Sequence, residues 1–366
     1  MADDQIQEPA PEEGDYEIDR EILRPVLAAV EAGDAAALST LLEPLHAADI
    51  ADLLEQVDDE TRVELVRLYG REFDGEILSE LDEGIREEVI DALHPSVLTD
   101  AVRELETDDV VDLIEDLEAP QQEAILGALE APDRVAVERS LTYPEFSAGR
   151  LMQREMVVAP EHWTVGEAID FMRSTDEMPD QFYHVILVDP RMRPTGYVTL
   201  GRNMASSRTA HLSDLTEPSF RAIPVLQDEA EVAYAFNQYH LISAPVVDEN
   251  DRLVGVITID DAMAVLDEEH EEDILRLAGV AEESSLSDSV ADTSKRRLPW
   301  LGVNMFTAIC ASLVISQFED SISQLVSLAI LMPIVASMGG NAGTQSLTVA
   351  VRALATRDLT SSNMWR

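Results

Sequence analysis

Two long stretches near the C-terminal end carry no charged side chain, and they constrain the fold more than any other feature. The first covers residues 299–318 and the second covers residues 325–350. A helix rises about 1.5 Å per residue, so about 20 apolar residues cross the roughly 30 Å hydrocarbon layer of a membrane. We therefore expect two transmembrane helices, with a pair of long core helices of a soluble protein as the alternative.

The residues around these stretches predict an orientation. Only Glu319 and Asp320 carry charge between them, so the two helices should form a hairpin. Residues 295–297 are basic and precede the first stretch, while Arg352 and Arg357 follow the second. Basic flanks face the cytoplasm by the positive-inside rule. We expect a multi-pass protein of the plasma membrane with a cytoplasmic N-terminal region and a lipid bilayer around residues 295–366.

The second stretch is not uniformly apolar. Asn341 and Gln345 lie four residues apart and therefore share a helix face. Polar groups in lipid need a partner or a water path, and neutral oxygens suit a hydrated Mg²⁺ ion. Tight helix packing around Gly339, Gly340 and Gly343 is the alternative.

The N-terminal half is helical in pattern. Residues 1–17 read as a disordered acidic tail, and residues 18–142 as a helical domain. Residues 48–57 and 108–117 match at several positions, sixty residues apart. Short repeated helices that bury one face against their neighbours predict an all-α superhelical arrangement.

Residues 143–264 contain two copies of a strand–helix–strand–strand–helix unit. The first has a helix at 164–173 and strands at 184–189 and 196–200; the second has a helix at 231–240 and strands within 244–261. The unit resembles a tandem pair of CBS repeats, which implies self-dimerisation and an adenine nucleotide such as ATP in the cleft. Thr258 and Asp261 resemble the residues that hold its ribose. The first copy has Thr199 but Arg202 at the matching positions.

An acidic helix at 265–280 and a linker, together residues 265–294, should connect the repeats to the membrane segment of residues 295–366. The complete expected architecture is multi-domain: an all-α N-terminal domain, an α/β CBS pair, a connecting helix and two transmembrane helices.

The charge balance excludes one class of partner. The net charge is −48, from 73 acidic and 25 basic residues, only one of them lysine. Nucleic acid binding requires basic clusters, so we expect no nucleic acid partner. The acidic surface attracts divalent cations, and adaptation to a salt-rich (halophilic) host is the alternative. No nucleophile elbow, phosphate-binding loop or Cys/His metal cluster is present, so no enzyme is expected.

The order of these parts resembles the MgtE family of magnesium channels. The similarity includes YPEFSAGRLM (143–152), PIVASMGGNAGTQS (333–346) and RALATRDL (352–359). It implies a homodimer, formed through the CBS and membrane domains, in which cytosolic Mg²⁺ bridges acidic residues and closes the pore. The ligands that it implies are Glu76, Asp108, Asp109, Asp112, Asp261, Glu269, Glu272 and Asp273. The pore residues that it implies are Gly340, Asn341, Gly343, Thr344 and Gln345.

The sequence also departs from the family. His240 and Ala264 stand where acidic residues would be expected. The family has five membrane helices, whereas this chain reaches Arg366 after the second. We expect a fragment, a truncated product, or a subunit completed by another polypeptide. The alternatives to a Mg²⁺ channel subunit are a membrane-anchored nucleotide-sensing CBS module and a non-conducting regulatory fragment.

Overall fold

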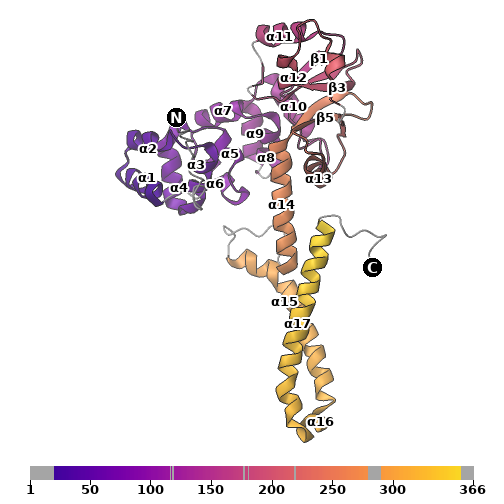
Figure 1. Cartoon of the computed structure of the whole chain (residues 1–366). Helices are drawn as coiled ribbons and strands as arrows, with labels where there is room; N and C mark the ends of the chain where they lie inside the picture. The colour runs from indigo at the N-terminus through magenta and orange to yellow at the C-terminus, as the bar shows by residue number, and fades with distance from the viewer. Residues whose placement is uncertain are drawn as a thin grey trace, which may run out of the picture. The chain divides into compact units, whose positions relative to one another are not determined.

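The computed structural model describes residues 20–278 and 290–355, apart from residues 116, 118, 176, 177, 180, 218 and 219. The chain divides into two compact units, Met1–Met263 and Ala264–Arg366, and each is described by itself (Figure 1). The expected acidic tail, and residues 281–289 of the expected linker, lie outside the described residues.

Short helices fill the first half of the first unit, as predicted. They are α1 (Arg20–Ala32), α2 (Ala35–Leu42), α3 (Ala47–Gln56), α4 (Asp59–Tyr69), α5 (Glu76–Ser79), α6 (Glu83–Ala92), α7 (Pro95–Glu104), α8 (Thr107–Glu115), α9 (Ala119–Ala128) and α10 (Ala131–Ser140). Helix α3 packs on α5, α4 on α6, α7 on α9, and α8 on α10. In these four pairs a helix packs on the helix two further along, and stacking of this kind is the arrangement of a solenoid.

A period of twelve residues underlies this stacking. An apolar or aromatic residue recurs at every twelfth position: Leu45, Val57, Tyr69, Leu81, Leu93, Leu105, Leu117 and Leu129. Two periods make one helical hairpin of 24 residues. An acidic residue follows the repeat position in successive hairpins, at Asp58, Asp82 and Glu106. Asp58 and Asp82 each accept a hydrogen bond from a backbone N–H of the next helix and so cap it.

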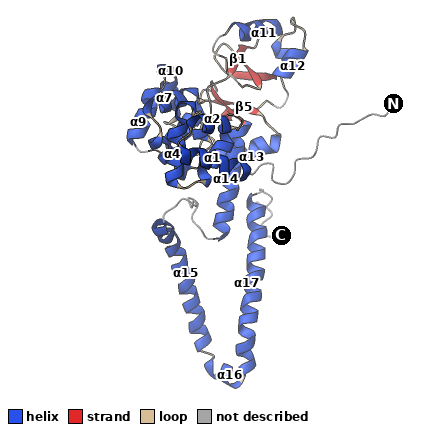
Figure 2. Ribbon diagram, turned by 90° about the vertical axis from the view of Figure 1, so that its left-hand side faces the viewer, coloured by secondary structure: helices blue, strands red, loops and turns tan. Residues whose placement is uncertain are grey.

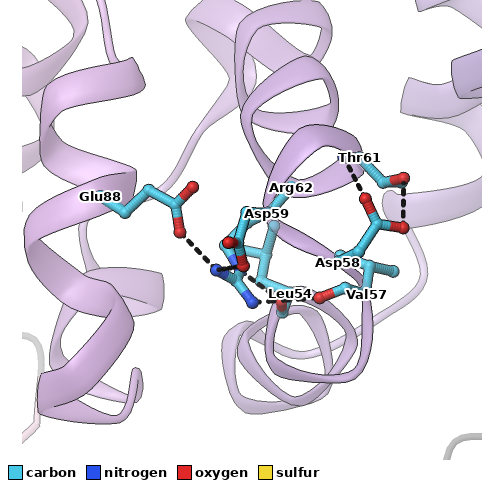
Figure 3. A network of polar contacts seen from close by, with 7 residues as sticks. All are labelled: Leu54, Val57, Asp58, Asp59, Thr61, Arg62 and Glu88. Carbon is cyan, nitrogen blue, oxygen red and sulfur yellow. Dashed lines mark hydrogen bonds and ion pairs between the residues drawn. The ribbon is translucent and has the colours of Figure 1, made fainter. Parts of the chain in front are cut away.

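Buried arginines join successive hairpins (Figure 3). Arg62 donates to the carbonyl oxygens of Leu54, at 2.8 Å, and Val57, at 3.0 Å, and it forms an ion pair with Glu88 of the next hairpin. Its residue is only 5 % exposed. The guanidinium therefore donates hydrogen bonds to the free carbonyl groups at the end of one helix and neutralises a carboxylate on another helix.

The same contact recurs 24 residues later. Arg86, also buried, donates to the carbonyl of Leu81 at 3.1 Å and pairs with Asp112 at 2.9 Å. We call the two ion pairs, Arg62–Glu88 and Arg86–Asp112, the arginine ladder. The next position in this series is Val110, so the ladder ends at α8.

The second half of the first unit is the pair of repeats. The first contains β1 (Val157–Pro160), α11 (Val165–Ser174), β2 (His184–Val188), β3 (Pro194–Thr199) and α12 (Leu200–Ala205). The second contains β4 (Ile223–Pro224), α13 (Glu229–Tyr239), β5 (Ser243–Val247), β6 (Leu253–Thr258) and the start of α14 (Ile259–Ala278). Each forms a three-stranded sheet with one parallel and one antiparallel pairing, in the orders β1-β2-β3 and β4-β5-β6.

The two sheets have the same register. His184 pairs with Thr199 in the first, and Ser243 pairs with Thr258 in the second. Both residues shift by 59 positions between copies. The His184 ring and the Ser243 hydroxyl are hydrogen-bonded to each other and buried, so the two copies meet at matching positions. The predicted tandem CBS pair is confirmed in its order of elements.

Helix α14 differs from the expectation of a separate helix beginning at residue 265. It starts at Ile259, directly after β6, and continues without interruption to Ala278. No proline or glycine lies between these residues, so nothing in the sequence ends the helix at the edge of the repeat.

The second unit contains two long helices joined by a short one. They are α15 (Val290–Ser316), α16 (Glu319–Gln324) and α17 (Val326–Ala355). Figure 2 shows α15 and α17 as the two arms of a hairpin that meet at α16. Among the described residues one segment, Leu298–Ser316, is long and apolar enough to cross a membrane. The second predicted span, residues 325–350, is not confirmed by the described residues and stays a prediction.

We predict that Arg62→Ala lowers the free energy of unfolding by about 2–3 kcal/mol, because two carbonyl groups and the Glu88 carboxylate lose their buried partner. Urea unfolding of the purified chain in detergent, followed by circular dichroism, measures the change. Arg134→Ala is the matched control: Arg134 pairs only with Glu138 on an exposed face, so its loss should cost no more than about 0.5 kcal/mol. Equal effects would contradict a structural role for the arginine ladder.

Candidate metal centre

Acidic side chains from two domains meet where the arginine ladder ends. Glu106, Asp108 and Asp109 lie at the start of α8, and Asp260 and Asp261 lie at the start of α14. We call these five residues the acid cluster. Asp108 is buried, with 7 % of its surface exposed. Asp261 accepts a hydrogen bond from the Thr258 hydroxyl at 2.6 Å.

Burial and mutual repulsion disfavour the charged forms of these residues. Burial, with the nearby Glu155 charge, raises the pKa of Glu106 to about 7. Burial, with the Asp261 charge, raises the pKa of Asp109 to about 7 and holds the pKa of Asp108 well above its usual range. Burial also raises the pKa of Asp261 to about 6. Carboxylates that repel each other across an interface are stabilised by protons or by a cation.

The acid cluster has no basic partner in the described part of the chain. Among the described residues, no basic side chain forms an ion pair with a member of the acid cluster. Val110 occupies the position of Arg62 and Arg86 in the two preceding hairpins. The hairpin that contributes α8 to the cluster therefore also lacks the buried arginine of those two hairpins.

The segment between the domains also enters this region. Gln153 Nε2 donates to Glu106 at 2.6 Å, and the Thr107 hydroxyl donates to Glu155 at 2.7 Å. The backbone of Gln153 pairs with Val256 of β6 through two hydrogen bonds of 2.9 Å. Gln153 and Glu155 were not predicted from the sequence, since their partners lie 47 and 48 residues away and no local pattern marks them.

The donor set fits a hard cation such as Mg²⁺, which prefers carboxylate and amide oxygens. Within the described residues, no three carboxylate, histidine or cysteine groups are already arranged around one ion-sized point. A cation would therefore draw the carboxylates together or bind through its own waters. Mg²⁺ commonly keeps several waters and takes only one or two carboxylates, so the arrangement is compatible with it.

The predicted ligands divide into three groups. Asp108, Asp109 and Asp261 come together in the acid cluster. Asp112 is exposed and paired with Arg86 instead, and Glu76 is an exposed residue at the start of α5. Glu269, Glu272 and Asp273 belong to later turns of α14 in the second unit, and they stay predictions.

The two departures from the family pattern have structural positions. His240 ends α13 in the left-handed conformation, with φ 53°. Its backbone N–H donates a hydrogen bond to the carbonyl oxygen of Phe236 and so caps the helix. Ala264 lies exposed on α14.

The residues predicted to hold a nucleotide are already engaged. Thr258 donates to Asp261, which also faces the acid cluster. In the first repeat, the Thr199 hydroxyl accepts from the backbone of Arg202, whose side chain pairs with Glu217 at 3.0 Å. An arginine in place of the aspartate cannot accept hydrogen bonds from ribose hydroxyls.

The predicted pore residues lie together on α17, where every one of them is exposed. They are Gly340, Asn341, Gly343, Thr344 and Gln345. A Cβ atom added to Gly340 or Gly343 would meet no other atom within 4 Å in this chain. These positions are open to another helix or to an ion path, and their role stays a prediction.

These features define a multidomain protein with a membrane segment: a helical domain and a CBS pair share an acidic junction, and an apolar hairpin follows. Residues 45–146 match the MgtE intracellular N domain family, residues 148–202 and 212–268 match the CBS domain family, and residues 332–366 match the divalent cation transporter family of MgtE. The chain thus contains segments that match both the intracellular N domain and the transporter domain named for MgtE.

Individual relatives agree with this assignment. The magnesium transporter MgtE of Bacillus subtilis is 32 % identical over 226 residues, which is 62 % of this chain and 50 % of that protein. The MgtE of Thermus thermophilus is 32 % identical over 219 residues, or 59 % of this chain and 49 % of that protein. The chain thus spans about half the length of the curated relatives that it matches.

Solved structures match about two thirds of the chain. The cytosolic domain of the Mg²⁺ channel MgtE in complex with ATP has a TM-score of 0.62 and 29 % identity; the match covers 66 % of this chain and 99 % of that one. The soluble part of a magnesium transporter has a TM-score of 0.57 and 23 % identity; the match covers 68 % of this chain and 98 % of that one. At this identity the match supports only the fold.

We predict that, with divalent cations removed, the first unit is more stable at pH 5.5 than at pH 8. Because Glu106 and Asp109 have raised pKa values of about 7, the folded state keeps protons that the unfolded chain releases above about pH 4. Their contribution is complete at low pH and lost as the pH rises through 7. Urea midpoints in EDTA at constant ionic strength measure this. A double variant, Glu106→Gln with Asp109→Asn, should reduce the difference in stability between the two pH values, while Asp108 and Asp261 maintain the rest. An unchanged difference would mean that Glu106 and Asp109 do not cause it.

Proposed function

We propose that the chain is the sensing region and first membrane segment of a divalent cation transporter subunit that is gated by cytosolic Mg²⁺. The observation that supports it best is the acid cluster: carboxylates from α8 and α14 face each other without a basic partner among the described residues. A cation that binds only when the two domains are docked stabilises the docked state. The membrane family match at residues 332–366 supports a transport role.

The mechanism that we propose is a population shift. At low Mg²⁺, repulsion among Asp108, Asp109 and Asp261 favours separation of α8 from the start of α14. At high Mg²⁺, the bound ion offsets this repulsion and the domains dock. Glu269, Glu272 and Asp273 would add further ligands along α14. Because α14 begins in the CBS pair and ends in the second unit, docking would change the state of the pore, which Asn341 and its neighbours would line.

We also propose that the subunit works as a homodimer in the plasma membrane. Met204 on α12 and Met263 on α14 occupy matching positions of the two repeats, 59 residues apart, and they are 67 % and 49 % exposed. Ile259 is exposed on the same helix as Met263. Exposed apolar side chains at symmetry-related positions suit a self-complementary interface.

A nucleotide is a second candidate ligand, because the cytosolic domain of the similar MgtE channel was solved in complex with ATP. Thr258 and Asp261 are the residues of this chain that match a ribose site. A CBS module that senses a nucleotide while anchored in the membrane would show a response to ATP without any response to Mg²⁺.

We predict that millimolar Mg²⁺ protects residues 20–275 of the purified chain from protease more than KCl of equal ionic strength does. Asp109→Asn combined with Asp261→Asn should remove most of that protection, because the ion loses ligands on both sides of the junction. Asp100→Asn is the matched control, since Asp100 is an exposed acid on α7 away from the junction. Equal protection by KCl would overturn the Mg²⁺-sensing proposal, and protection by ATP alone would favour nucleotide sensing.

We predict that Met204→Glu with Met263→Glu shifts the detergent-solubilised chain from a dimer to a monomer, because charges would be buried at the proposed interface. Light scattering after size-exclusion chromatography gives the mass. Met192→Glu is the control, because Met192 is exposed on a turn of the first repeat. A wild-type chain that is monomeric would contradict the homodimer.

A further inference from the structure

Gln153 contains a buried oxygen without a hydrogen-bond partner. The residue is 2 % exposed, and its Nε2 atom donates to Glu106 at 2.6 Å, whereas its Oε1 atom has no hydrogen-bond partner among the residues that the structure describes. A buried amide oxygen left without a donor costs about 1–3 kcal/mol. Buried polar atoms of this kind are rare in folded proteins and commonly mark a water or an ion.

The position of this oxygen indicates what it can bind. Oε1 and Nε2 share one amide carbon, so Oε1 lies no more than about 5 Å from the Glu106 carboxylate. Glu106 in turn is close enough to Asp109, Asp260 and Asp261 for their charges to act on it. An acceptor beside several carboxylates suits a positive ion or a water bound to one. Amide oxygen is one of the ligand types that Mg²⁺ and Ca²⁺ accept.

We propose that Gln153 supplies a neutral oxygen ligand, directly or through one bound water, to the divalent cation of the acid cluster. This inference rests on the proposed function. The amide group presents a donor and an acceptor of nearly the same shape. Without the ion, Nε2 donates to Glu106; with the ion, a half-turn of the amide directs Oε1 to it. The side chain thus serves both states of the site.

The backbone around Gln153 holds this ligand in place. Gln153 exchanges two hydrogen bonds with Val256 of β6, and β6 continues through Thr258 into Asp260 and Asp261. Gly255 permits the close approach, because a Cβ there would lie 2.7 Å from the Gln153 carbonyl oxygen. Gln153 and Asp261 are therefore fixed by the same strand, and the ion would join both to α8.

Mn²⁺ binding to the full chain in detergent tests the role of Gln153, with free Mn²⁺ measured by electron paramagnetic resonance. Gln153→Met removes the oxygen and should weaken Mn²⁺ binding at the cluster about tenfold. Gln153→Glu keeps an oxygen and should bind Mn²⁺ at least as tightly as the wild type. A role limited to donating a hydrogen bond to Glu106 predicts instead that both variants are equally weakened, which would overturn the proposal.

The controls are Gln121→Met and Gln121→Glu, because the Gln121 amide also donates to an aspartate, Asp91, at 2.9 Å but outside the cluster. These variants should leave the affinity unchanged within about twofold. Thermal unfolding in EDTA identifies a variant that does not fold, and Gln153→Glu supplies the second variant if Gln153→Met fails. The double variant Asp109→Asn with Asp261→Asn separates the two proposals. If this double variant binds Mn²⁺ as tightly as the wild type, the proposed function is wrong. If the double variant binds Mn²⁺ weakly but Gln153→Met binds it as tightly as the wild type, only the inference about Gln153 is wrong.

Discussion

Repulsion between carboxylates that no arginine neutralises is the interaction on which the first unit depends. In the helical domain, a buried arginine neutralises a carboxylate at two successive hairpins. Arg62 and Arg86 each close a helix end and pair with an acid of the next hairpin. At α8 the series continues with Val110, and the acids at the start of that helix face Asp261 instead. Hydrogen bonds of Gln153 with Glu106 and of Thr107 with Glu155, and the ion pair of Arg150 with Glu115, join the helical domain to the segment that follows it. The acid cluster itself has no basic partner among the described residues.

This contrast connects stability with regulation. A permanent internal cation makes the first two contacts independent of the solution, because an arginine stays charged at every physiological pH. A junction that lacks one responds to whatever cation the solution offers. In the proposed function, stability and sensing are therefore separated along the chain: the arginine ladder would stabilise the helical domain, and the acid cluster would respond to the cation. The linker side chains Gln153 and Glu155 reach the same place from the CBS side.

Much of the architecture could be predicted from the sequence, because hydrophobic period and turn residues are local signals. The helical domain, the order of strands in both repeats and the helical hairpin follow from such signals. Asp108, Asp109 and Asp261 were indicated by family resemblance, and the structure brings them together. Gln153 and Glu106 were missed, because their contact joins residues 47 positions apart. The importance of Val110 is visible in the sequence only after the twelve-residue period has been recognised.

The uninterrupted course of α14 has a mechanical consequence. Its twenty residues form a rod about 30 Å long, and the first turn of that rod contains Asp260 and Asp261. Pivoting such a rod by roughly ten degrees would carry its distant tip through about 5 Å, the rise of one helical turn. In the proposed function, a rearrangement of under an ångström among oxygen atoms at the first turn would therefore become a displacement several times larger at the last turn. The length of α14 would set the size of that displacement.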